Sequence, residues 1–121
     1  MPVQRALAAF KSGRLNCAQS ILRAFQQQPG IHEGAVQQAQ QFGRGRAEGG
    51  RCGALHMALQ LANNKEVRDN LRKAFAAKAG SEQCREIRKR KALSCEQCVE
   101  LAATMLTECQ HVGSEGRRKC L

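Results

Sequence analysis

The sequence predicts an all-α fold, a single compact helical domain of about five to six short helices. Ala, Gln, Leu, Arg and Glu dominate the chain, and these residues favour helix. No stretch shows the sustained alternation of β-branched residues that is typical of a strand. A length of 121 residues fits one domain. We therefore expect a helical four-cysteine domain over residues 1–112 and a flexible basic tail over residues 113–121.

Glycine and proline divide the first half of the chain into three expected helices. The opening helix spans Pro2–Phe10, and Gly13 ends it. Asn16 is a typical N-cap residue for the second helix, which stops at the Pro-Gly pair of residues 29–30. The third helix covers residues 31–42, before a loop that is rich in glycine.

The second half of the chain predicts further helices with short connections. One helix spans residues 52–62. Apolar residues four apart mark the next helix, which Gly80 closes, and a short segment around Cys84 follows. The last helix runs from Ser94 to about Gln110, and Gln97 completes a capping box with Ser94 at its start.

The chain is strongly basic, with 20 Lys and Arg residues against 10 Asp and Glu residues. Such a surplus attracts nucleic acid, anionic membranes or acidic proteins. Trp and Tyr are absent, so the stacking platforms of a single-strand nucleic-acid binder are missing and nucleic acid is disfavoured. The basic run of residues 85–91 is typical of a solvated helix face, and it could also dock an acidic redox partner.

The expected compartment bears on how the seven cysteines are interpreted. The first apolar stretch is too short for a signal peptide, and no run approaches a membrane span. We therefore expect a cytoplasmic protein without a membrane partner, in a compartment that keeps thiols reduced. Seven cysteines in that setting indicate metal binding or catalysis more readily than a disulfide framework.

Four of the cysteines are expected in the first turn of a helix. Cys17 and Cys95 directly follow predicted N-cap residues, and Cys52 follows the glycine-rich loop. Cys84 lies three residues after a serine. Unpaired backbone N–H groups and the helix dipole favour negative charge there, which lowers the pKa of a thiol and increases its reactive thiolate form. The alternative is that these cysteines pack as small hydrophobic residues.

The other sulfur and histidine candidates have weaker patterns. Cys98 forms a C-x-x-C motif with Cys95, but it also starts a stripe at helical spacing that includes Cys109 and is typical of core packing. Cys120 lies in the expected tail and is interpreted as an incidental thiol. His56 lies four residues beyond Cys52 and is a candidate ligand, although such a histidine more often packs.

Four segments between about residues 10 and 106 are similar to the motifs of a known family: "FKSGRLNCAQSILRAF", "QQFGRGRAEGGRCGAL", "GSEQCREI" and "CEQCVELAA". In order and spacing they resemble the C_GCAxxG_C_C family of redox-active proteins. The resemblance implies a helical fold, a redox or metal-cluster role, and Cys17, Cys52, Cys84 and Cys95 as the family cysteines. One departure is Met57, which stands at the final glycine of the family motif and would narrow the space for a cluster.

Three functions remain open at this point. The first is a redox-active four-cysteine site that exchanges thiols and disulfides or holds an iron–sulfur cluster for electron transfer. The second is a structural zinc or soft-metal module with the same ligands. The third is a basic nucleic-acid-binding protein whose cysteines pack. For the first, we expect Cys17 close to Cys52, with Cys84 and Cys95 completing the group and Cys98 as the first substitute.

Overall fold

The computed structural model describes residues 2–26, 33–43, 46–62, 64–90 and 93–115. The all-α prediction is confirmed, with no strand in those ranges. They hold seven α-helices rather than the expected five to six, because the segment after Cys84 forms a helix of its own. The elements are α1 (Pro2–Lys11), α2 (Cys17–Ala24), α3 (Glu33–Gln38), the 3-10 helices η1 (Ala39–Phe42) and η2 (Glu48–Gly50), α4 (Gly53–Leu61), α5 (Lys65–Ala79), α6 (Cys84–Arg90) and α7 (Cys95–Glu115).

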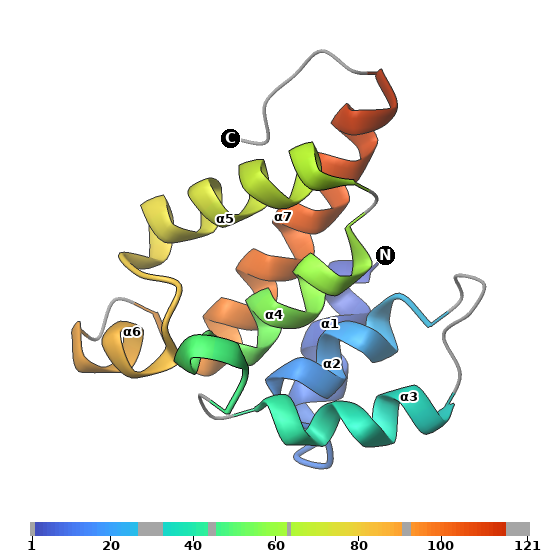
Figure 1. Ribbon diagram of the computed structural model, residues 1–121. Helices are drawn as coiled ribbons and strands as arrows, with labels where there is room; N and C mark the ends of the chain where they lie inside the picture. The colour runs from blue at the N-terminus through green and yellow to red at the C-terminus, as the bar shows by residue number, and fades with distance from the viewer. Residues whose placement is uncertain (1, 27–32, 44–45, 63, 91–92, 116–121) are drawn as a thin grey trace.

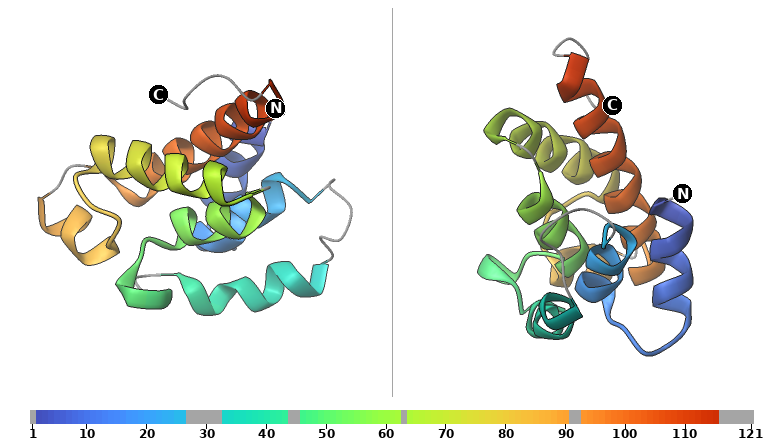
Figure 2. Two further views of the ribbon diagram at one scale, coloured as in Figure 1. Left: turned by 45° about the horizontal axis from the view of Figure 1, so that its top comes forward. Right: turned by 90° about the vertical axis from the view of Figure 1, so that its right-hand side faces the viewer.

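The long helix α7 runs through the molecule, and α1, α2, α4 and α5 all pack against it (Figure 1). Helix α2 also packs against α1 and α4, which makes it part of the centre. Helices α3 and η1 cover α2 from the outside, whereas α5 lies far from α3 in both views of Figure 2. None of the described helices combines the length and the apolar character needed to cross a membrane.

The core lies where α2, α4, α5 and α7 meet. Ile21, Leu55, Phe75 and Leu106 are fully buried there, one from each helix. Burying a side chain of this size contributes about 1.5–3 kcal/mol. Helix α4 is buried on every side, because each residue from Gly53 to Leu59 is buried. The start of α4, and with it Cys52, is therefore held inside the molecule.

Two expected elements differ from the structure. The third helix breaks after Gln38, where the chain tightens from α3 into the 3-10 helix η1. The last helix ends at Glu115 instead of near Gln110. The predicted flexible tail falls mainly on residues 116–121, which lie outside the described residues, and so does the predicted stop at residues 29–30.

Local capping explains where the helices begin and end. Asn16 accepts a hydrogen bond from the Gln19 N–H group, and the Gln19 side chain accepts one from the Asn16 N–H group. Ser94 and Gln97 form the same reciprocal pair before α7, as the sequence predicts. Gly80 ends α5 with φ at 86°, a left-handed conformation that favours glycine.

Replacing Asn16 by Ala should cost more stability than replacing Asn64 by Ala. Both residues cap a helix, which is typically worth about 1 kcal/mol. Asn16 also donates a 2.9 Å hydrogen bond to the Gln40 carbonyl, which ties α2 to η1. Urea unfolding under reducing conditions should give a loss of about 2 kcal/mol for Asn16→Ala and about 1 kcal/mol for Asn64→Ala. Equal losses would show that the link to Gln40 adds nothing.

Candidate functional site

Five cysteines line one cavity of about 430 Å³. The cavity lies where the turn between α1 and α2 meets the start of α4, helix α6 and the start of α7. All four cysteines that the sequence analysis selected line this cavity. The fifth is the one expected as a substitute. The cysteines are Cys17, Cys52, Cys84, Cys95 and Cys98.

The predicted positions at helix starts are confirmed for all four selected cysteines. Cys17, Cys84 and Cys95 are the first residues of α2, α6 and α7. Cys52 is the N-cap residue of α4. Four helices therefore begin around the same cavity. Cys98 lies one turn into α7, on the face that is packed into the core.

The loops that precede α4 and α6 are joined directly. The Cys52 N–H group donates a 2.7 Å hydrogen bond to the Glu82 carbonyl, next to a short bridge between Arg51 and Gln83. The Glu82 carboxylate lies 3.6 Å from the Arg51 guanidinium and 2.9 Å from that of Arg72. Cys84 follows this joined segment immediately. The link therefore brings Cys84 beside Cys52, although the two residues are 32 positions apart in the sequence.

Gly53 allows the start of α4 to approach α2. A Cβ atom on Gly53 would lie 2.6 Å from the Phe42 carbonyl oxygen and 2.8 Å from the Cys17 sulfur. Both distances are too short for real atoms, so a larger residue would push at least one of these neighbours away. The glycine therefore fixes how closely Cys17 and Cys52 can lie.

Cys52 and Cys98 line the cavity together and their side chains interact. The interaction with the Cys98 thiol, together with burial, raises the pKa of the Cys52 thiol well above its ordinary value. The N–H groups of Ala54 and Leu55 at the start of α4 act in the opposite direction, as the helix-start argument expects, but they do not prevail. The predicted net lowering of the Cys52 pKa is therefore wrong, because the Cys98 thiol and burial outweigh the effect of the helix start.

The five sulfurs differ in their access to solvent. Cys52 and Cys98 are each only 4 % exposed, and Cys17 and Cys84 are also buried, whereas Cys95 is exposed. All five are present as thiols. Among the described residues that line the cavity, Arg88 alone carries a charge. The cavity therefore presents one exposed thiol, Cys95, and a pair of interacting buried thiols, Cys52 and Cys98.

The thiols suit soft metals by chemistry, but their arrangement does not fit a metal centre. In the part of the chain that the structure describes, no three His, Cys, Asp or Glu side chains are grouped closely enough to hold an ion. An iron–sulfur cluster or a zinc ion would need the sulfurs to move. His56 is buried and its ring packs against Phe42, with 4.7 Å between ring centroids. Met57 is buried in the core and is not among the residues that line the cavity.

The sequence analysis undervalued Cys98. Its stripe does pack in the core, since Ala102 and Met105 are buried with it. The same inward orientation also brings its sulfur to Cys52, which the C-x-x-C spacing alone does not indicate. The side chain of Cys109 and all of Cys120 lie outside the described residues, so their expected exclusion from the group stays a prediction.

A family model described as "Putative redox-active protein (C_GCAxxG_C_C)" matches residues 15–109. The chain belongs to this family. The matched region contains all five cysteines of the cavity. Neither the curated proteins nor the solved structures include a match to the chain.

Replacing Gly53 by Ala should destabilise the protein by about 1–3 kcal/mol, because the added methyl group meets the Cys17 sulfur and the Phe42 carbonyl. Urea unfolding measures the loss. The control is the same substitution in a Cys17→Ala background, where one of the two clashes is gone and the loss should be smaller. Greater stability of Gly53→Ala would instead mean that the helix propensity of Ala outweighs the contacts.

Stability should fall as the pH rises above about 8.5, the ordinary pKa of an unfolded cysteine. Folding raises the pKa of Cys52, so its contribution is complete below that pH and is lost as the pH rises toward the folded pKa. The expected slope from one such group is about 1.4 kcal/mol per pH unit. Anaerobic urea unfolding should show this slope in the native chain and a flatter one in Cys52→Ala. Parallel curves would contradict the raised pKa.

Proposed function

We propose that the protein performs thiol–disulfide exchange with a disulfide partner, through the cysteines of this cavity. The observation that carries the proposal is a cavity lined by two interacting buried thiols, Cys52 and Cys98, and by the exposed Cys95. Two neighbouring thiols can form a disulfide when their Cα atoms lie within about 7 Å of each other. Membership of a family described as redox-active supports this chemistry.

The exchange begins at Cys95, the exposed thiol. Its thiolate attacks one sulfur of the partner disulfide and forms a mixed disulfide, while the other partner sulfur leaves as a thiolate. Cys98, one turn further along α7, then attacks the Cys95 sulfur. This step releases the second partner thiol and leaves a disulfide between Cys95 and Cys98.

The last step moves the disulfide into the interior. Cys52 attacks the Cys98 sulfur, a Cys52–Cys98 disulfide forms, and Cys95 leaves as a thiolate. Over the whole sequence two protein thiols are oxidised by two electrons, and one partner disulfide becomes two thiols. The two protons of the protein thiols pass to the partner sulfurs. The reverse sequence oxidises a partner dithiol.

The raised pKa of Cys52 fits the role of the last thiol to react. A protonated thiol is a poor nucleophile, so Cys52 does not compete with the exposed Cys95 for the first attack. Once Cys98 is part of a disulfide, its thiol no longer interacts with the Cys52 thiol. Removal of that interaction removes the first cause of the raised pKa, which readies Cys52 for its step.

Cys17 and Cys84 complete the cavity wall without a step in this sequence. They remain the ligands of the other version of the site, in which four thiolates hold an iron–sulfur cluster or zinc. That version needs Cys17, Cys52, Cys84 and Cys95 to converge further than they do here. Measuring iron, sulfide and zinc in protein isolated without oxygen therefore tests the exchange proposal as well. A stoichiometric cluster or zinc ion would overturn it.

Oxidation of the reduced protein by 2-hydroxyethyl disulfide, an uncharged small disulfide, should yield one disulfide between Cys52 and Cys98. Remaining thiols are blocked with iodoacetamide, and the bond is located by peptide mass spectrometry. Cys98→Ser and Cys52→Ser should each abolish the buried disulfide. Cys84→Ser is the matched control, since it removes another buried thiol of the same cavity and should leave the bond intact.

The role of Cys95 is tested by the rate rather than by the product. Cys95→Ser should slow oxidation strongly, because the remaining cavity thiols are buried, yet the same Cys52–Cys98 bond should form eventually. An unchanged rate would show that the disulfide reaches the buried pair without Cys95. A stable bond that joins Cys17 or Cys84 instead would overturn the assignment of the pair.

A further inference from the structure

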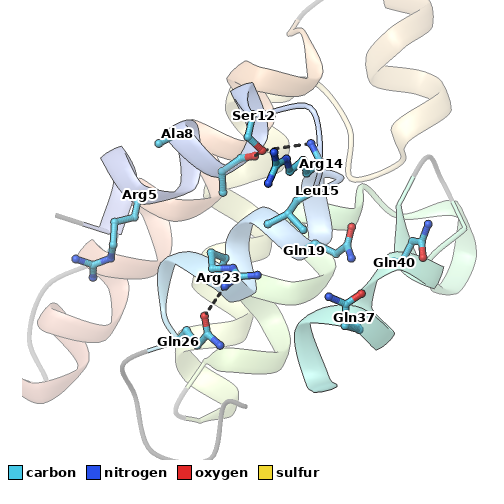
Figure 3. Close-up of a pocket in the computed structure, with 11 residues that line it drawn as sticks. Arg5, Ala8, Ser12, Arg14, Leu15, Gln19, Arg23, Gln26, Gln37 and Gln40 are labelled. Carbon is cyan, nitrogen blue, oxygen red and sulfur yellow. Dashed lines mark hydrogen bonds between the residues drawn. The ribbon is translucent and has the colours of Figure 1, made fainter. Parts of the chain in front are cut away.

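A second, larger hollow lies beside the cysteine cavity. It is an open groove of about 1010 Å³ between α1, α2, α3 and η1 (Figure 3). Its lining is almost free of large apolar side chains, with Leu15 as the exception. Arginine, glutamine and serine supply most of the rest, and no aromatic residue is among the described lining. The groove therefore offers a ligand guanidinium, amide and hydroxyl groups that are set among aliphatic side-chain atoms.

The three arginines of the groove differ in how far they are already engaged. Arg23 is paired with Glu33 at 2.8 Å and also donates to Gln26. Arg5 uses its Nε atom for a 3.1 Å hydrogen bond to the Ala24 carbonyl. The Arg14 side chain is exposed and makes no hydrogen bond or ion pair with any residue that the structure describes.

These contacts leave two cationic groups without a counter-charge in the described chain, Arg5 and Arg14, on the wall formed by α1 and the turn after it (Figure 3). Arg5 lies on α1 and Arg14 lies in the turn after it, and both line the groove. Two carboxylates in one extended segment can meet both guanidinium groups.

Glutamine side chains cover the opposite wall. Gln37 projects from α3 and Gln40 from η1, and both are exposed (Figure 3). A primary amide both donates and accepts hydrogen bonds, which matches the alternating N–H and C=O groups of an extended peptide backbone. A ligand that presents carboxylates to the arginine wall and backbone amide groups to the glutamine wall is an acidic peptide.

We infer that this groove binds an acidic, extended segment of a partner protein. Single-stranded nucleic acid is the other polyanion of this shape, but the groove offers no ring for a base to stack on. The Glu33 carboxylate beside Arg23 would also repel a continuous phosphate backbone. The hydrogen bond from Gln26, together with the nearby Arg23, lowers the pKa of Glu33, so this carboxylate stays charged at neutral pH.

The groove and the cysteine cavity share a wall. Leu15 lines both, and its neighbours Arg14 and Asn16 line the groove and the cavity respectively. A segment bound in the groove therefore ends beside the cavity that holds Cys95 and Cys98. A role of the groove in selecting the disulfide partner rests on the proposed thiol–disulfide exchange. Binding of an acidic segment by itself does not rest on it.

Fluorescence anisotropy tests the groove with a labelled peptide of alternating glutamate and serine that contains no cysteine. Binding should be lost when glutamine replaces glutamate in the peptide, and it should weaken as salt is added. Arg14→Gln should weaken binding by up to about fivefold, and Arg5→Gln combined with Arg14→Gln by more. Lys73→Gln is the matched control, because Lys73 is an exposed cation on α5, away from the groove.

Three outcomes would overturn the inference. Equal weakening by Lys73→Gln and Arg14→Gln would mean that only the net positive charge attracts the peptide. Loss of binding by Lys89→Gln, with Arg14→Gln unchanged, would place the acidic segment on the basic helix α6 instead. Tighter binding of a labelled single-stranded oligonucleotide, sensitive to Arg14→Gln, would make the groove a nucleic-acid site. None of these results depends on the thiols, whereas oxidation by the uncharged disulfide does not need the groove.

Discussion

The hydrogen bond from the Cys52 N–H group to the Glu82 carbonyl is the constraint on which the cavity depends. It joins the loop before α4 to the loop before α6, and the ion pairs of Glu82 with Arg51 and Arg72 lie around it. Helix α4 is buried on every side, so its start cannot move toward α6 by itself. The link instead brings α6 to α4, and Cys84 comes with it. Without this joint, nothing in the two loops would hold Cys84 beside Cys52.

Burial and helix position have opposite effects on Cys52. Helix starts favour a thiolate because unpaired N–H groups point at it, and the Ala54 and Leu55 N–H groups do lower its pKa. Desolvation and the neighbouring Cys98 sulfur raise it further than those groups lower it. Two cysteines that both stand at helix starts can therefore have different surroundings. Cys52 is buried whereas Cys95 is exposed, so the depth at which the helix start lies differs between them.

The helix starts at the four cysteines could be predicted because their signals are local. Asn16 and Ser94 cap the helices next to them, and a few neighbouring residues suffice to recognise such caps. The contact between Cys98 and Cys52 could not be predicted in this way. It depends on the rotation of α7 about its axis relative to α4, which only the packed core decides. The spacing of Cys98, Ala102 and Met105 indicated an inward face, but not which sulfur that face would meet.

The groove was missed for a related reason. Arg5, Arg14 and Gln37 are unremarkable surface residues in the sequence, and only the packing of α1, α2 and α3 brings them around one hollow. Asn16 connects that hollow to the cavity. Its side chain caps the helix that begins with Cys17, and it also donates to the Gln40 carbonyl on the groove side. A ligand that shifts η1 therefore acts on the same asparagine that fixes the start of α2. The capping box is thus a direct physical connection between the groove and the residue that begins α2, Cys17.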